Sequence, residues 1–325
     1  MHTTMIYPVA GSTSSSNQRP RRRSTSTSSS TRSSSQNFSR PSIARKPVPS
    51  THPIPKSTSL PLRSHSDSKI QTTSIAPRPH RSIRKSKMPV YFLTGANRGI
   101  GLEFVRQLAS KPSNTIIAGV RSLNGDISEL KELAASGNSN IHIIECDVSS
   151  LDSLSSIEFR VAEILSKTGA NLDYLFNIAG INATSTDTSL TLDPKSLAEH
   201  MQTNVLGPAK IVESLRKYLA RGATVLNMSS GLGSLTVATD VTKCCTYSMS
   251  KAALNMLTLH QARDLKNVGV RVVCMDPGWV KTRMGGKGAM IEANVSVESM
   301  LDVVDNLKEK DSGKFYRYDG AIVPW

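Results

Sequence analysis

From residue 88 onward, short runs of apolar residues alternate with longer stretches of helical periodicity. The first unit reads PVYFLTGANRGIGLEFVRQLAS: an apolar run, a glycine-rich turn and an amphipathic stretch. Short runs that are apolar throughout are typical of strands buried on both faces, as in a parallel sheet covered by helices on each side. The alternation therefore predicts one α/β domain, a doubly wound parallel sheet of the Rossmann type. The further predicted strands are 114–120, 140–146, 171–180, 223–230 and 269–278, and the predicted helices are 126–136, 150–167, 193–220 and 246–267.

The net charge of the chain belongs to its first 87 residues. They hold 16 of the 40 Lys and Arg residues and a single acid, Asp67, whereas residues 88–325 hold 24 basic and 24 acidic residues. The leading segment is rich in Ser, Thr, Arg and Pro, and it has too few apolar residues to offset its chain entropy by burial. We therefore predict a disordered basic extension over 1–87 and a catalytic domain over 88–325.

Three other interpretations of the extension stay open. Its Arg-rich, Ser-rich and acid-poor composition also matches a mitochondrial transit peptide, although the opening MHTTMIYPVAGSTSSS has no basic amphipathic pattern. The run RPRRRS offers contact with nucleic acid or an anionic membrane, but no aromatic residues interleave for base stacking, which argues against nucleic acid. Met88, directly before the first strand, is an alternative start of the protein.

Composition also limits the compartment and the metal chemistry. No apolar run reaches the roughly 18 residues of a membrane-spanning helix. The four cysteines show neither metal-ligand spacing nor a disulfide framework, which fits a reducing compartment. We expect a cytoplasmic protein without a metal site, with a mitochondrial location as the alternative.

The turn TGANRGIG predicts a dinucleotide site. Gly95, Gly99 and Gly101 lie between the first strand and the first helix. Glycines there let backbone amides approach a pyrophosphate, and the helix N-terminus adds partial positive charge.

The end of the second strand indicates which dinucleotide is bound. A site for NAD usually has an acid there, which accepts from the ribose 2′-hydroxyl. Here the strand ends in Arg121, and Arg98 lies in the turn, so two guanidinium groups are available for a 2′-phosphate. NADP is therefore favoured over NAD, with a solvated surface arginine as the alternative for Arg121. After the third strand, the Asp147 carboxylate can accept from the adenine amino group, or it can cap a helix.

The segment YSMSK places Tyr247 and Lys251 on one face of a helix, one turn apart. A phenol ordinarily has a pKa of about 10, which is too high for a base at neutral pH. An ammonium group beside it favours the phenolate and lowers that pKa.

In this order, the motif TGxxxGxG, an Asn-Ala-Gly strand end, a serine after the fifth strand and YxxxK resemble the short-chain dehydrogenase/reductases. The resemblance covers residues 88–325. The closing SGKFYRYDGAIVPW and the long interval from Ser230 to Tyr247 resemble the subgroup of sniffer carbonyl reductases and C-factor-like signalling proteins.

The resemblance implies roles for individual residues. Tyr247 is the expected general acid or base, Lys251 supports it and holds the nicotinamide ribose, Ser230 orients the substrate oxygen, and Asn204 anchors a water on the proton path. Taken singly, each also has a structural explanation as packing or capping. The expected cofactor-binding residues are Gly95, Asn97, Arg98, Gly99, Ile100, Gly101, Arg121, Asp147, Val148, Asn177, Ala179, Gly180, Tyr247, Lys251, Pro277, Gly278, Val280 and Thr282.

The chain departs from the family pattern at two places. Ile178 stands where the family has a second asparagine, and the loop before Tyr247 is longer than usual. The glycine-rich residues after Thr282 predict a mobile flap over 283–300. The expected activity is NADPH-dependent reduction of an aldehyde, ketone or quinone. A cofactor-binding signalling protein with little catalysis is the alternative, and both a monomer and a homodimer stay open.

Overall fold

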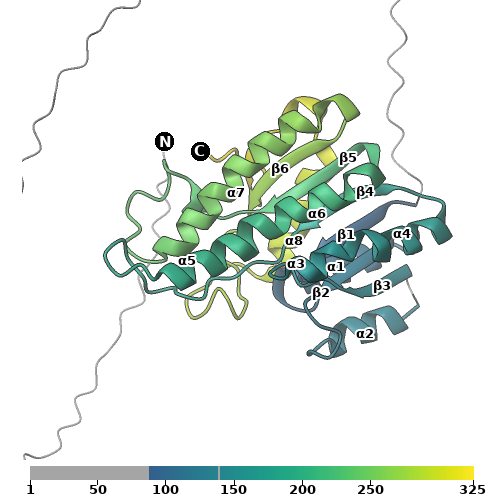
Figure 1. Ribbon diagram of the computed structural model, residues 1–325, viewed down its shortest axis with the longest axis horizontal. Helices are drawn as coiled ribbons and strands as arrows, with labels where there is room; N and C mark the ends of the chain where they lie inside the picture. Colours follow the sequence, from purple (N-terminus) through teal and green to yellow (C-terminus); the bar gives the residue numbers. More distant parts are fainter. Residues whose placement is uncertain (1–87, 138–139) are drawn as a thin grey trace, which may run out of the picture. The chain divides into compact units, whose positions relative to one another are not determined.

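Seven parallel strands form one sheet in the order β3-β2-β1-β4-β5-β6-β7 (Figure 1). The structure is a computed structural model that describes residues 88–137 and 140–325, so the predictions for 1–87 lie outside the described residues. The observed architecture confirms the predicted doubly wound α/β fold. The strands are β1 (Val90–Thr94), β2 (Thr115–Val120), β3 (Asn140–Glu145), β4 (Leu172–Asn177), β5 (Leu219–Met228), β6 (Arg271–Asp276) and β7 (Phe315–Arg317).

Helices cover both faces of the sheet. Successive β1 residues alternate between two apolar clusters: Tyr91 and Leu93 face α1, α2 and α8, while Val90 and Phe92 face α4, α6 and α7. In Figure 1, α6 and α7 run across the front of the strands. The α-helices are α1 (Gly99–Ala109), α2 (Ser128–Ala135), α3 (Leu151–Ser155), α4 (Ile157–Thr168), α5 (Pro194–Met201), α6 (Gly207–Leu215), α7 (Cys245–Asp264) and α8 (Ala293–Asn306).

The predicted continuous helix over 193–220 is wrong. Between α5 and α6 the chain forms a π-helical turn, η1 (Gln202–Leu206), and β5 already begins at Leu219. Pro208 explains the wide turn, because it has no N–H for the carbonyl four residues earlier, that of Asn204, and its ring would clash with that oxygen. A π-turn of this kind is frequent at functional sites.

Two elements near the C-terminal end were not predicted. Residues 293–306 form α8, which buries Val297, Met300 and Val304 in the core, so only the first part of the predicted flap over 283–300 is a loop. Strand β7 is three residues long and pairs with β6.

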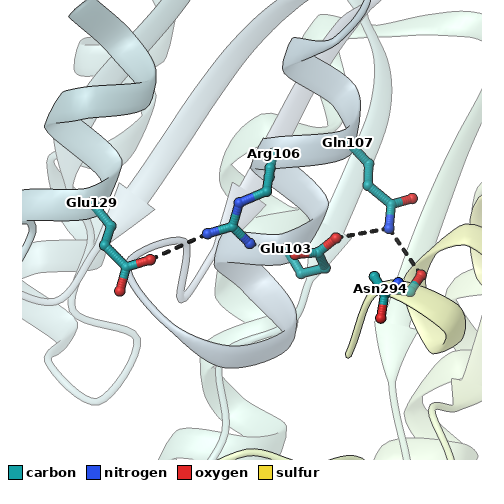
Figure 2. Close-up of polar contacts among 5 residues, drawn as sticks. All are labelled: Glu103, Arg106, Gln107, Glu129 and Asn294. Atoms are coloured by element: carbon teal, nitrogen blue, oxygen red, sulfur yellow. Dashed lines mark hydrogen bonds and ion pairs between the residues drawn. The ribbon is translucent and has the colours of Figure 1, made fainter. Parts of the chain in front are cut away.

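Polar contacts hold α1 between its two neighbouring helices (Figure 2). Arg106 pairs with Glu129 of α2, with 3.2 Å between Nη2 and Oε2. The Gln107 amide donates to Glu103 within α1 and to the backbone oxygen of Asn294 at the start of α8, both at 2.9 Å. The helix that follows the glycine-rich turn is therefore fixed from both sides.

The strand order reverses between β1 and β4, and ligands of open α/β sheets bind at such a reversal. Here the Thr94 hydroxyl at the end of β1 accepts from the amides of Ile178 and Ala179 after β4, each at 3.1 Å. This bond pair joins the carboxyl ends of the two strands. Within the part of the chain that the structure describes, no helix has both the length and the apolar character needed to cross a membrane.

Candidate active site

The glycine-rich turn is packed too closely for side chains. A β-carbon at Gly101 would lie 2.1 Å from the Gly95 oxygen. Gly95 itself has φ +70°, and a β-carbon there would lie 3.0 Å from the Ala179 α-carbon. The N-cap residue of α1, Arg98, makes no capping bond with its side chain, so the first amides of the helix are available to an anionic ligand. The turn thus fits a dinucleotide phosphate.

Three predicted cofactor-binding residues lie in or beside this turn. Arg98 and Arg121 are exposed, and neither has an ion-pair partner within the described ranges. The Asn97 amide donates to the Asp126 oxygen at 3.0 Å, which connects the turn to the loop before α2. Asn97 thus has a structural contact whatever it does toward a ligand.

Asp147 and Val148, which follow β3, make different contacts. Asp147 accepts from the Ser149 amide at 2.9 Å and from its hydroxyl at 2.6 Å through Oδ1. Its other oxygen has no partner in residues 88–137 and 140–325. Val148 is buried, and a β-carbon at Gly207 would lie 2.7 Å from its oxygen, so glycine is needed where α6 meets the segment after β3. The helix-capping alternative for Asp147 is wrong, because the N-cap of α3 is Ser150, whose side chain accepts from the Ser153 amide.

The segment after β4 carries the departure from the family pattern. Asn177 donates to Asn227 at 2.8 Å inside the domain, and Asn227 donates onward to Thr258 and Gln261 of α7. Ile178, in place of the second asparagine, packs its side chain on the core. The side chains of both residues thus have structural contacts, and the cofactor contact of Asn177 stays a prediction.

Tyr247 and Lys251 lie on α7 as predicted, one turn apart. Lys251 is only 3% exposed, and its Nζ lies 5.5 Å from the centre of the Tyr247 ring. One ammonium hydrogen is directed to the Met228 oxygen, 2.7 Å away at the end of β5. Burial lowers the pKa of Lys251 from 10.5 to about 8, so the ammonium form still prevails at neutral pH.

Asn255, one turn beyond Lys251, binds the Ser230 loop to α7. Its Oδ1 accepts from the Ser229 hydroxyl at 2.5 Å, and its Nδ2 donates to the Gly233 oxygen at 3.1 Å. A β-carbon at Gly233 would lie 2.8 Å from that of Lys251. Ser230, between these anchors, accepts from the Leu232 amide at 3.2 Å and keeps its own hydroxyl hydrogen for a ligand.

Asn204, in the π-helical turn η1, lies in the same region as Lys251. It is fully buried and exchanges hydrogen bonds with the backbone of Ile181, 2.8 Å to the amide and 3.0 Å to the oxygen. It also donates to the Ser250 hydroxyl at 2.9 Å. A β-carbon at Gly180 would lie 3.2 Å from Asn204 Oδ1 and 3.4 Å from Lys251 Nζ, so all three residues adjoin.

The loop after β6 closes the other side of the site. The Pro277 oxygen accepts from Ser296 of α8 at 2.7 Å. Val280 is buried and bridges to Ile291. The Thr282 methyl group lies 3.4 Å from where a β-carbon of Gly99 would be, which brings this loop onto the phosphate turn.

Sequence reasoning missed two buried carboxylates. Asp276 accepts from the Gly278 amide at 3.0 Å, and burial raises its pKa. Its position just before the Pro-Gly pair was a usable signal. Asp187 accepts from the Thr246 amide at 2.9 Å and so holds the first turn of α7, but it lies 59 residues away in sequence and had no signal.

Comparison with known protein families identifies the family of this chain. The short chain dehydrogenase family profile matches residues 89–290. The chain belongs to the short-chain dehydrogenase family.

Individual members of the family are similar to this short-chain dehydrogenase. It is 38% identical over 156 residues to C-signal of Myxococcus xanthus, covering 47% of this chain and 93% of that protein. The crystal structure of NADPH-bound carbonyl reductase from chicken fatty liver has a TM-score of 0.68 and 33% identity, covering 74% and 100% of the two chains. The carbonyl reductase Sniffer of Drosophila melanogaster has a TM-score of 0.67 and 32% identity, covering 73% and 100%. The expected sniffer and C-factor-like subgroup is thereby confirmed.

Proposed function

We propose that this short-chain dehydrogenase is an NADPH-dependent carbonyl reductase that acts on an aldehyde, ketone or quinone of a small molecule. The observation that carries the proposal is the half-buried Tyr247 above the buried Lys251, on a helix that Asn255 binds to the Ser230 loop. The similarity to a carbonyl reductase with bound NADPH supports it.

In the proposed reaction, Tyr247 donates its phenolic proton to the carbonyl oxygen, and Ser230 donates a hydrogen bond that orients that oxygen. The bound nicotinamide supplies the hydride. Lys251 has two ammonium hydrogens beyond the one on Met228, which suffice for a ribose hydroxyl and a proton path toward Asn204. Its positive charge favours the phenolate that forms as the proton leaves.

The preference for NADP over NAD rests on Arg98 and Arg121. Both are exposed beside the phosphate turn, and no acid stands at the end of β2 to accept from a free 2′-hydroxyl. The similarity to the NADP-bound carbonyl reductase of Pseudomonas aeruginosa, which is 26% identical with a TM-score of 0.60, supports the use of NADP.

A panel of aldehydes, ketones and quinones, assayed with NADPH and with NADH, tests the function. We expect Tyr247→Phe to lower kcat/KM by at least about 100-fold, because a positioned general acid contributes about 10²–10⁴. NADPH binding, followed by fluorescence, should be kept. Tyr218→Phe is the matched control, since that tyrosine lies beside Lys217 outside the site.

Two outcomes would contradict the assignment: no carbonyl is reduced with either cofactor, or the phenylalanine variant works as well as the wild type. The first outcome, combined with tight NADPH binding, would favour a second candidate function. In that case the protein would be a signalling protein that binds the cofactor with little catalysis. The 38% identity to C-signal supports this second candidate.

A further inference from the structure

Three arginines come from separate loops around the phosphate turn. Arg98 belongs to the turn, Arg121 follows β2, and Arg283 follows Thr282 in the loop after β6. All three are exposed, and in the described residues none has a carboxylate partner. Partial burial, and after it the positive charges of Arg283 and Arg121, lower the pKa of the Arg98 guanidinium, which is consistent with both arginines lying near Arg98. Like charges gathered without a counter-ion form an anion site.

The loop of Arg283 reaches the first residue of α1. The Thr282 side chain is 3.4 Å from the β-carbon position of Gly99, and no side chain caps the helix that Gly99 begins. Arg283, one residue on, therefore starts beside the free amides of the helix N-terminus.

Hydrogen bonds within the loop fix this placement. The Gly286 amide donates to the Thr282 oxygen at 3.1 Å, and the Gly285 amide donates to the Thr282 hydroxyl at 3.2 Å. The Trp279 indole donates to the Gly285 oxygen at 2.7 Å, and the Trp279 oxygen accepts from Ile291. Residues 279–291 thus form a closed loop that carries Arg283 on its edge.

NADP has two anionic groups, the pyrophosphate and the 2′-phosphate. The cluster of Arg98, Arg121 and Arg283 carries more positive charge than the 2′-phosphate alone needs. Arg98 and Arg121 serve that phosphate in the function proposed above. We propose that Arg283 binds the pyrophosphate of the cofactor and draws the loop 279–291 onto it. This inference rests on the proposed use of a dinucleotide.

Calorimetric titration with NADP⁺ and NAD⁺, without carbonyl substrate, tests the proposal. Arg283→Ala should weaken both nucleotides by about tenfold, as expected for one charge-assisted contact to a group that they share. Arg121→Ala should weaken NADP⁺ alone. Arg221→Ala is the control and should change neither, because this exposed arginine lies beside Gly269 near the amino-terminal end of β5, away from the carboxyl ends of the strands.

Two smaller ligands separate the phosphates. ADP-ribose carries the pyrophosphate without the 2′-phosphate, so Arg283→Ala should weaken it, whereas binding of 2′-AMP should be unchanged. Hydrogen exchange supplies a second readout: NADP⁺ should slow the amides of residues 279–291 in the wild type and less so in Arg283→Ala.

Unchanged dissociation constants for both dinucleotides in Arg283→Ala would overturn the proposal. A loss confined to NADP⁺ would overturn it as well, because Arg283 would then read the 2′-phosphate. Wild-type protein that binds dinucleotides yet reduces no carbonyl would refute the reductase function and leave the Arg283 contact standing.

Discussion

The buried positive charge of Lys251 lowers the stability of the cofactor-free fold. The pKa of about 8 lies below the 10.5 of an unfolded chain, so the unfolded state binds more protons between these pH values. Stability therefore rises with pH through this window: the penalty of burial is complete below pH 8 and has gone above pH 10.5. A bound dinucleotide, by offering ribose hydroxyls, would offset part of it.

We expect this penalty to appear as a difference between wild type and Lys251→Met. Without cofactor, the free energy of unfolding of the wild type minus that of the variant should rise by about 2 kcal/mol between pH 7 and pH 10. Other titrating groups, such as Tyr174, whose pKa burial raises to about 12, occur in both proteins and cancel. Urea unfolding over this pH range measures the effect, and parallel curves would contradict it.

Single residues of the site differed in how well the sequence predicted them. Tyr247 and Lys251 were predictable because both lie within one helical turn, and the glycines because the turn has a fixed place after β1. The bonds of Asn255 and Asp187 were not, because their partners are distant in sequence and no local pattern encodes them.

At the level of elements, α7 is unusual because its buried face is largely polar. Ser250, Lys251, Asn255, Thr258 and Gln261 are all buried and hydrogen-bonded. Such a helix is positioned by directional bonds to β5 and to the Ser230 loop, which suits an element that must hold a phenol in one place.

The loop before α7 is held by the last residues of the chain. Ser234 is buried and donates to the Pro324 oxygen at 2.6 Å, and Thr236 donates to the Trp325 oxygen at 2.8 Å. The Trp325 ring stacks on Phe315 of β7 with 5.6 Å between centroids. We call this arrangement the C-terminal clasp, defined by Ser234, Thr236, Phe315, Pro324 and Trp325.

Loosening the clasp should affect the substrate and spare the cofactor. Ser234→Ala removes a buried hydrogen bond worth about 1 kcal/mol, so KM for a carbonyl substrate should rise about fivefold while the NADPH dissociation constant is kept. Steady-state kinetics and titration measure the two quantities. Ser136→Ala, an exposed serine bonded only within its own helix turn, is the control. An unchanged KM in Ser234→Ala would show that the clasp does not shape the substrate loop.

The elements missed from the sequence have a common physical reason. Strand β7 is too short to form an apolar run, and it exists because it pairs with β6. The apolar positions of α8 were attributed to a flap because the glycines before them suggested motion, yet Val297 and Met300 pack on α1 in the core. Tertiary contacts, rather than local pattern, decide both elements.

Over the whole molecule, the described core is built from residues 90–323, and the net positive charge of the sequence lies before it. We expect residues 88–325 alone to fold, with a midpoint of thermal unfolding within about 2 °C of that of the full chain, since about 1 kcal/mol would shift it by 2–4 °C. The NADPH dissociation constant should match within about twofold. Calorimetry and titration of both proteins check this, and a fragment that aggregates or binds NADPH more weakly would place a structural role in 1–87.

The clasp also has a consequence for protein synthesis. Residues 315–325 are synthesised after Tyr247, yet they fix the loop that precedes it, and β7 completes the edge of the sheet. The glycine turn and β1–β4 can therefore assemble around a nucleotide while residues 315–325 are still in the exit tunnel, whereas the carbonyl-binding side must wait until those residues have emerged. Translation itself would then impose an order on the two halves of the site, cofactor first and substrate second.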